Sequence, residues 1–352
     1  MKIPRNIKSF LEKYERHLSL GALLFGFTMD NLTLTRIDLL FDNIILLSYL
    51  TIAGGSILFL NIFPNAKLAQ FLPYTMQYAF GGLFSGYVVF YSRSGSLVGS
   101  WPFLLMLLIL LIGNEFLRKK YARLNFQLSI YFIAVFSFLI FSIPVVLGKM
   151  GPFIFMLSGM ASIFIISIFI AILKQSLREK TQYSFSRTWL IIGGILIAIS
   201  LLYSTNLIPP IPLALKEFNI YYKVERTGAN YTLYEESKAW YTFYKRDEFK
   251  HLAGTPLYAY SAIFAPTRIE GTIIHEWQYF DEVKDVWITK DRLTFPIVGG
   301  RDGGYRGYSL KRSLTPGLWR VDVENELGQL LGRKKFIIVE GAIPKTLEQK
   351  IK

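Results

Sequence analysis

Charged and amide side chains gather at the edges of the first two long apolar segments of this 352-residue chain, at Asp30, Arg36, Asp38, Asp42 and Asn43. Asp38 and Asp42 are spaced one helical turn apart, so on a helix they would share a face. Ionisable residues at membrane depth are candidates for solute transport or acid–base chemistry. Ion pairing at the membrane boundary, of Arg36 with Asp30 or Asp38, is the simpler explanation.

A sixth boundary candidate, Glu115, lies next to Arg118 and Lys119 at the other end of an apolar segment. It is explained in the same way, by pairing with these bases. A path for protons or cations would need an acidic residue in the middle of a span, and the sequence places none there.

The glycine-rich segment Gly299-Gly-Arg-Asp-Gly-Gly304 is a second candidate site. Its backbone amides and Arg301 could hold an anionic group, with Asp302, Tyr305 and Arg306 beside them. The alternative is a hairpin turn that needs positive φ, in which Arg301 and Asp302 pair with each other or with strand ends. It lacks the Lys-Ser/Thr ending of a phosphate loop.

His275 and Trp277 form a third candidate because they share one face of a strongly alternating segment. A histidine general base needs a nucleophile or an acid nearby, and none is evident. We therefore expect a structural histidine bonded to a backbone carbonyl. The aromatic residues could form a stacking platform or a core, and Trp319 is assigned to the core. The platform candidates are Trp240, Tyr241, Tyr244, Trp277, Tyr279, Trp287 and Trp319.

The chain has no cysteine and three isolated histidines, so we expect no disulfide, no metal site and no cofactor. The net charge of +14 and the pI near 9.6 would suggest nucleic acid. The excess is mostly explained by bases that flank apolar segments, where they set membrane orientation and meet anionic lipids. A lipid bilayer is the expected partner, and nucleic acid is not.

Seven apolar stretches predict about seven transmembrane helices within residues 1–213. They are approximately Leu18–Thr33, Leu39–Phe63, Leu68–Tyr91, Trp101–Leu117, Phe126–Leu147, Phe153–Leu173 and Trp189–Leu207. Fourteen of the seventeen Lys and Arg of this half fall at the N-terminus or in alternate connections, which places the N-terminus in the cytoplasm and the C-terminal domain outside. The expected location is the cytoplasmic membrane of a bacterium, and an uncleaved signal anchor is expected rather than a cleaved signal peptide.

After the proline-rich junction that ends at Pro212, the pattern changes to period-two alternation, as in Trp319–Glu324. Residues 214–345 are predicted to form an all-β, immunoglobulin-like antiparallel sandwich, and residues 346–352 a basic tail. A short helix is expected over Lys238–Lys250. Strands are expected near 219–226, 231–235, 256–264, 271–280, 284–290, 292–298, 305–310, 317–324 and 329–339.

Several motifs resemble an uncharacterised bacterial family with a domain of unknown function, DUF2914. In the C-terminal half they are Phe264-Ala-Pro-Thr267, His275-Glu-Trp277, the segment 299–308, Pro316–Asp322 and Gly328–Gly332. In the membrane half they are Arg36–Asn43 and Asn114–Arg118. The resemblance implies the same architecture and assigns no activity.

The expected function is therefore a non-catalytic, membrane-anchored module outside the cytoplasm that binds or senses an envelope glycan, peptide or protein. One alternative is a transporter or channel that uses Asp30, Asp38 and Asp42. Another is an envelope enzyme acting on lipid-linked sugars, with Asp38 and Asp42 as acid and base.

Overall fold

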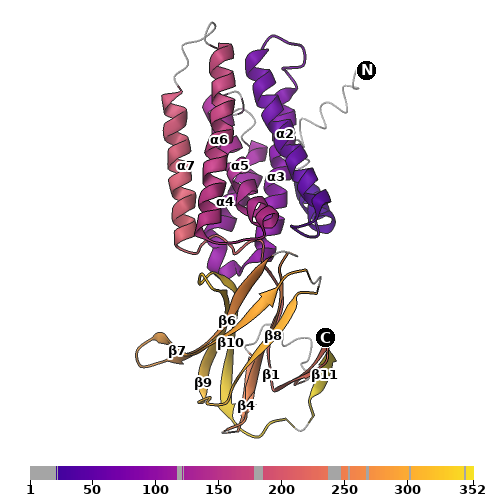
Figure 1. Cartoon of the computed structure of the whole chain (residues 1–352), viewed down its shortest axis with the longest axis vertical. Helices are drawn as coiled ribbons and strands as arrows, with labels where there is room; N and C mark the ends of the chain where they lie inside the picture. The colour runs from indigo at the N-terminus through magenta and orange to yellow at the C-terminus, as the bar shows by residue number, and fades with distance from the viewer. Residues whose placement is uncertain are drawn as a thin grey trace. The chain divides into compact units, whose positions relative to one another are not determined.

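The computed structural model describes residues 21, 23–116, 121, 123–177, 185–236, 247–252, 254–266, 269–300, 303–344 and 346–352. The chain divides into two compact units. The first consists of Met1–Ser92 and Trp101–Leu207, and the second of Arg93–Ser100 and Ile208–Lys352. The first unit is helical and the second is rich in β-strands (Figure 1).

Each apolar stretch with described residues folds as a helix. A helix at residues 23–33 is followed by α2 (Leu40–Ile62), α3 (Leu72–Ser94), α4 (Leu97–Phe116), α5 (Leu124–Leu147), α6 (Pro152–Leu177) and α7 (Ser186–Ser204). Four of them, α2, α5, α6 and α7, are long and apolar enough to cross a bilayer. The chain is therefore a membrane protein by the length and composition of these helices.

The helix α3 is long enough to span a membrane but carries many glycine, serine and tyrosine residues. Its side chains are mostly buried against other helices, including Phe80, Phe84, Tyr87 and Tyr91. Tyr87 and Tyr91 donate hydrogen bonds to backbone carbonyls of α5 at 2.8 and 2.9 Å. A helix surrounded by protein tolerates polar residues that lipid would not, which explains its lower hydropathy.

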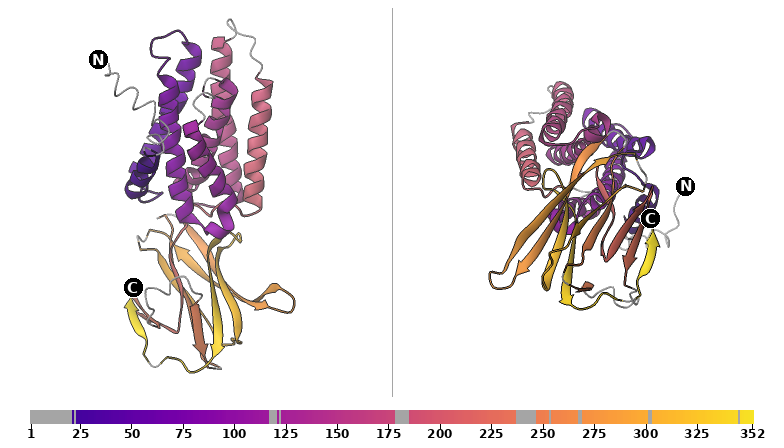
Figure 2. Two further views of the ribbon diagram at one scale, coloured as in Figure 1. Left: turned by 180° about the vertical axis from the view of Figure 1, so that it is seen from behind. Right: turned by 60° about the horizontal axis from the view of Figure 1, so that its bottom comes forward.

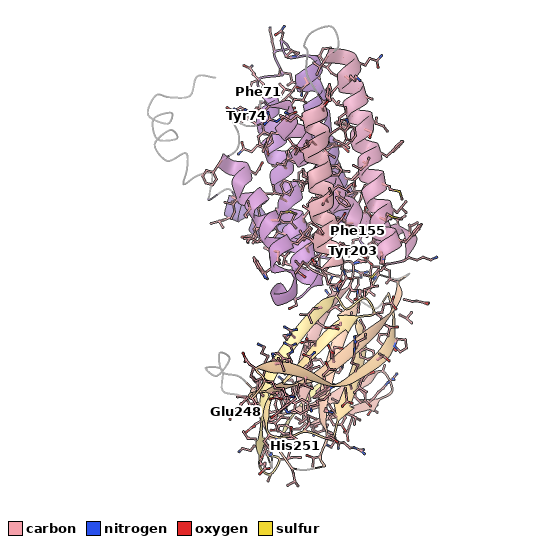
Figure 3. The ribbon with its side chains drawn as sticks, turned by 90° about the vertical axis from the view of Figure 1, so that its left-hand side faces the viewer. Phe71, Tyr74, Phe155, Tyr203, Glu248 and His251 are labelled. Atoms are coloured by element: carbon pink, nitrogen blue, oxygen red, sulfur yellow. The ribbon has the colours of Figure 1, made fainter. Side chains whose placement is uncertain are left out.

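The helix α5 packs against α6 and α7, and the three helices line an open, mainly apolar cavity of about 650 Å³. Phe155 of α6 and Tyr203 of α7 stack in this cavity with ring centroids 3.9 Å apart (Figure 3). Met156, Met160 and Phe164 are each more than half exposed on the same helix. In a bilayer such side chains contact acyl chains.

The described residues of the second unit form three sheets, whose strand pairs are antiparallel apart from the parallel pair β10–β4. The orders are β1-β5-β8, β4-β10-β9-β6-β7 and β11-β3-β2. The strands are β1 (Ala214–Tyr221), β2 (Lys223–Thr227), β3 (Asn230–Glu235), β4 (Asp247–His251), β5 (Leu257–Phe264), β6 (Glu270–Asp281), β7 (Val286–Val298), β8 (Tyr305–Lys311), β9 (Gly317–Asn325), β10 (Leu330–Glu340) and β11 (Glu348–Ile351).

One hydrophobic core lies between the β1-β5-β8 sheet and the five-stranded sheet. Its largest members are Trp277 and Trp319, with 0 % and 1 % of their surfaces exposed. Ala259 of β5 and Phe336 of β10 complete the contact between the two sheets. The assignment of Trp319 to the core agrees with this burial.

The strand pattern corrects four details of the sequence prediction. Residues 348–351, expected within a basic tail, form β11, which pairs with β3. Residues 247–250, expected to end a helix, form β4 instead, and residues 237–246 lie outside the described residues. The segments 284–290 and 292–298 form the single strand β7, and the segment 219–226 is divided between β1 and β2. Both errors arise because alternation shows which residues face the core but not where one strand ends.

The hairpin of β6 and β7 extends beyond the rest of the five-stranded sheet (Figure 2). Its turn is closed by the Asp281 carboxylate, which accepts backbone N–H bonds from Val283 and Lys284 at 3.0 and 3.1 Å. Asp285 completes the turn with φ of 53°, in the left-handed region. Val283 at the tip is 95 % exposed.

Candidate functional site

His275 lies on the inward face of β6 and is fully buried. Its Nε2 is 2.8 Å from Ser261 Oγ of β5, and its Nδ1 is 2.9 Å from Ser309 Oγ of β8. Trp277 donates its indole N–H to the same Ser309 oxygen at 2.9 Å. This polar network joins the five-stranded sheet to the β1-β5-β8 sheet.

Burial in this network lowers the pKa of His275 from 6.5 to about 3, so the imidazole is neutral. The indole can only donate, so Ser309 accepts from Trp277 and can direct its own hydroxyl proton to Nδ1. A proton on Nε2 then bonds to Ser261. The expected partner was a backbone carbonyl; the observed partners are two serine hydroxyls, which also satisfy a structural histidine.

The glycine-rich segment begins with two amides that are already bonded. Gly299 N–H donates to the Ile269 carbonyl and Gly300 N–H to the Ala265 carbonyl, both at 3.0 Å. A side chain at position 299 would place its Cβ only 1.7 Å from the Pro266 oxygen, so glycine is required there. These contacts are those of a turn packed on Ala265, Pro266 and Ile269.

The other candidates of this loop are only partly described. Arg301 and Asp302 lie outside the described residues, so an anion site at these positions stays a prediction. Tyr305 and Arg306 are half-buried at the start of β8, and the Arg306 carbonyl accepts the Tyr231 hydroxyl at 3.2 Å.

The boundary candidates around α2 hold the backbone together. Asp42 is 2 % exposed and accepts the backbone N–H groups of Thr35 and Arg36 at 2.9 and 3.1 Å. Asn43 donates to the carbonyls of Ile37 and Leu39 at 2.7 and 2.9 Å. Both side chains therefore tie the preceding turn to the first turn of α2.

Asp38 forms the ion pair expected at this boundary, accepting from Arg36 Nε and Nη2 at 3.0 and 2.7 Å. It precedes the first residue of α2, so it does not share a helical face with Asp42, contrary to the sequence prediction. The two carboxylates are thus engaged separately. The side chain of Glu115 lies outside the described part of the structure.

Asp30 is placed differently from the other boundary residues. Leu34, four residues further on, packs against Gly86 near the middle of α3, where an added Cβ would be 3.2 Å from it. The helix at residues 23–33 therefore ends beside the middle of α3. Asp30 lines a cavity there together with Tyr49 and Ser85. The sequence did not indicate this position beside the middle of another helix.

The opposite, outward face of the five-stranded sheet carries a cluster of carboxylates and guanidinium groups. Glu276 of β6 and Asp322 and Glu324 of β9 offer carboxylate oxygens that all lie within 4.8 Å of one another. Arg333 of β10 donates to both oxygens of Asp322 at 2.7 and 2.5 Å. We call this set, with Arg292 and Arg320, the carboxylate–arginine cluster.

Arg292 links the remaining carboxylates, with nitrogens 4.0 Å from Glu276 and 3.8 Å from Glu324. Glu276 also accepts the Thr289 hydroxyl at 2.8 Å. Burial, together with the charges of Glu276 and Asp322, raises the pKa of Glu324 to about 7. Glu324 therefore changes its charge near neutral pH. The Asp322 carboxylate, in contrast, is bonded through both oxygens to Arg333.

Three carboxylates at this spacing could hold a hard cation such as Ca²⁺ or Mg²⁺. Here Arg333 is already bonded to Asp322, and Arg292 lies near Glu276 and Glu324. A cation would therefore be repelled unless these arginines moved away. The donor set fits a ligand that both donates and accepts hydrogen bonds better than it fits a metal ion.

An aromatic ring adjoins the cluster. The Arg320 guanidinium lies 4.4 Å from the ring centroid of Trp287, and the Lys335 ammonium lies 5.6 Å from it. Sequence reasoning named Trp287 but missed the carboxylates. The available signal was the acidic pair at 322 and 324, which alternation places on the face opposite Trp319; Glu276 and Arg333 join it only through the strand register.

Residues 270–338 match the family model described as protein of unknown function (DUF2914). The match confirms the resemblance found in the sequence for this region. It covers β6 to β9 and β10 as far as Ile338. No curated protein matches the chain.

Similar solved structures give low structural agreement. A β-glucosidase from Listeria innocua in complex with gluconolactone has a TM-score of 0.20 at 12 % identity, over 36 % of this chain and 16 % of that one. The alkylpurine DNA glycosylase AlkC of Pseudomonas fluorescens has a TM-score of 0.20 at 10 % identity, over 86 % of this chain and 99 % of that one. Such scores carry no argument about fold or function.

Proposed function

We propose that this protein is a membrane-anchored module that binds a glycan of the bacterial cell envelope, without turnover, on the outward face of the five-stranded sheet. The supporting observation is the carboxylate–arginine cluster with Trp287 beside it. Sugar hydroxyls donate to carboxylates and accept from guanidinium groups, and a flat indole can pack against the apolar face of a sugar ring.

Glu324 is the carboxylate best placed to accept a ligand. Its closest basic atom among the described residues is Arg292 Nη2 at 3.8 Å, which is longer than a hydrogen bond. Arg292 itself is 53 % exposed. Both side chains can therefore exchange water for a ligand hydroxyl while Arg333 keeps Asp322 in place.

The anchoring part of the proposal rests on the helices and on the charge pattern. We place about seven helices in the cytoplasmic membrane, with the N-terminus inside and the β-rich unit outside as an immunoglobulin-like sandwich. Four long apolar helices and the biased distribution of basic residues support this topology. The core between the β1-β5-β8 sheet and the mostly antiparallel five-stranded sheet supports the sandwich.

The test is binding of the full-length protein, in phosphatidylglycerol nanodiscs, to an array of bacterial glycans, with empty nanodiscs as the blank. Trp287→Ala and Glu324→Gln are expected to weaken binding at least about tenfold. Glu248→Gln is the matched control; Figure 3 labels Glu248. Glu248 pairs with Ile337, whereas Glu324 pairs with Leu330 at the other end of β10.

Unchanged binding by both variants would contradict the assignment of this face. Binding only to peptides or to an envelope protein would move the proposal to that ligand class. Release of free sugar from the array would contradict the absence of turnover.

Transport is a second candidate, and one observation favours it. The structure places Asp30 beside the middle of α3, where a carboxylate in a solute path would be expected. Asp38 and Asp42, in contrast, are engaged by Arg36 and by backbone amides.

A further inference from the structure

A cavity of about 540 Å³ lies within the helical unit. It is formed by the helix at residues 23–33 and by α2, α3 and α4. Its lining is mostly aromatic and apolar, with one carboxylate: Leu23, Phe25, Gly26, Phe27, Met29, Asp30, Tyr49, Tyr74, Gln77, Tyr78, Gly81, Gly82, Ser85 and Leu111. Its volume falls within the range of small-molecule sites.

The glycine Gly82 shapes this cavity. A Cβ at position 82 would lie 2.6 Å from the Tyr49 ring, so only glycine allows this ring to rest on the α3 backbone. The Tyr49 ring meets Tyr78 edge-on, with centroids 5.7 Å apart and an interplanar angle of 77°. The Tyr49 hydroxyl is close enough to Asp30 to interact with its charge. The two rings therefore form a fixed wall next to the carboxylate.

Asp30 has no ion-pair partner within the described part of the chain, since Arg36 pairs with Asp38. A charged carboxylate at membrane depth is costly unless a cation or hydrogen bonds compensate it. Ser85 lies beside it near the middle of α3, is 3 % exposed, and its hydroxyl is close enough to Asp30 to donate a hydrogen bond to the carboxylate. Within the described part of the chain the carboxylate thus has a neutral hydroxyl beside it and no cation.

We propose that this cavity binds the ammonium group of an amphipathic amine. The ammonium would donate hydrogen bonds to the Asp30 carboxylate and to Ser85 Oγ, and would lie against the faces of Tyr49 and Tyr78. The apolar part of the amine would contact Phe25, Phe27 and Leu111. This site is separate from the proposed glycan face and does not depend on it.

The lining selects this chemistry over an inorganic cation. Ca²⁺ and Mg²⁺ need six or more oxygen ligands at 2.0 to 2.6 Å, and the described lining of this cavity offers a single carboxylate among aromatic rings. A phosphate would be repelled by the Asp30 carboxylate. Phe25, Tyr74 and Tyr78 are each more than half exposed on the helix surfaces, so the cavity can receive its ligand from the lipid side.

The experiment uses the full-length protein in dodecyl maltoside micelles at pH 7, with 2-phenylethylamine as the probe and calorimetry as the readout. Saturable binding is expected, and Asp30→Asn should weaken it at least about tenfold through loss of the counter-ion. Tyr78→Leu should weaken it about threefold to tenfold. Asp38→Asn is the control, because Asp38 pairs with Arg36 outside the cavity lining, and it should leave affinity unchanged.

The neutral analogue 2-phenylethanol, which has the same carbon skeleton, should bind at least about tenfold more weakly, because it lacks the charge. Equal affinity of the two compounds, equal affinity of Asp30→Asn, or absence of binding by the folded protein would each overturn the proposal. Folding of each variant is checked by its elution volume and thermal unfolding. Ser85→Ala, a small change in a helix, is the second cavity variant, so the proposal stays testable if Asp30→Asn fails to fold.

Two sources of the amine are separated by competition. Displacement of the probe by phosphatidylethanolamine, but not by phosphatidylglycerol, would identify a lipid headgroup as the ligand. Displacement by neither lipid would identify a free amine. Both results support the ammonium site.

Discussion

The two faces of the five-stranded sheet accommodate polar groups in opposite ways. On the inward face, His275 is neutral and bonded to Ser261 and Ser309. On the outward face, three carboxylates lie among three arginines, and the pKa of Glu324 is raised to about 7. The inward network leaves its ring nitrogens no capacity for a ligand, whereas the outward cluster keeps exposed and incompletely bonded groups. A ligand site is therefore expected on the outward face.

The largest difference between the two faces should appear in the free energy of unfolding when the tryptophan on each face is replaced by alanine. Trp319→Ala removes a side chain that is 1 % exposed and should lower the free energy of unfolding of this unit by about 3 to 5 kcal/mol. Trp287→Ala, on the outward face, should lower it by about 1 kcal/mol. Hydrogen exchange of β9 and β10 peptides in the full-length protein measures both. Equal losses would show that Trp287 is a core residue and would remove it from the proposed site.

Asp322 is the buried member of the cluster, with its side chain 2 % exposed. Asp322→Asn leaves Arg333 without its charged partner and should cost about 2 to 4 kcal/mol, by the same exchange measurement. The double variant with Arg333→Gln should recover part of this loss, because the two residues act as one unit. Additive losses would show that the pair contributes little beyond its packing.

The pH dependence of stability should separate the two faces. Because the pKa of His275 is about 3 in the folded protein and 6.5 when unfolded, the unfolded chain binds more protons between these values. Stability contributed by His275 is thus complete above pH 6.5 and falls by about 1.4 kcal/mol per pH unit below it, toward pH 3. Thermal unfolding of His275→Gln against wild type should show this slope disappear.

Glu324 should change the pH dependence of stability in the opposite direction from His275. Its effect should be weaker, since its side chain remains partly solvated. Its pKa is about 7 in the folded state and 4.5 when unfolded, so the folded state binds more protons between these values. Its contribution therefore falls as the pH rises from 4.5 to 7. Glu324→Gln should be more stable than wild type at pH 8 and should steepen the loss on acidification below pH 6.5. An unchanged pH profile would contradict a raised pKa at this position.

Much of the fold could be predicted from the sequence. Lipid demands long apolar segments, so each helix was visible, and a half-buried sheet demands alternation, so most strands were visible. The end of the helix at residues 23–33 beside the middle of α3 was not visible, because it depends on Leu34 packing against Gly86. The position of Asp30 beside the middle of α3 was missed for that reason.

The candidate sites show where sequence reasoning reaches its limit. The alternation of β9 assigned Trp319 correctly, but the groups around Asp322 and Glu324 come from β6, β7 and β10 and require the register of these strands. The partners of His275 come from the other sheet. Side chains joined across strands carry no local pattern, whereas Asp42 and Asn43, which bond within eight residues, belong to a motif that the sequence displayed.

The turn between β6 and β7 has a practical consequence. It projects from the sheet, Val283 at its tip is 95 % exposed, and the chain contains no cysteine. Val283→Cys would therefore create a single, accessible thiol at a position that tolerates change. Labelling of this thiol in intact cells by a maleimide that cannot cross the membrane would report on which side of the bilayer the β-rich unit lies: rapid labelling is expected, and labelling only after lysis would reverse the proposed orientation.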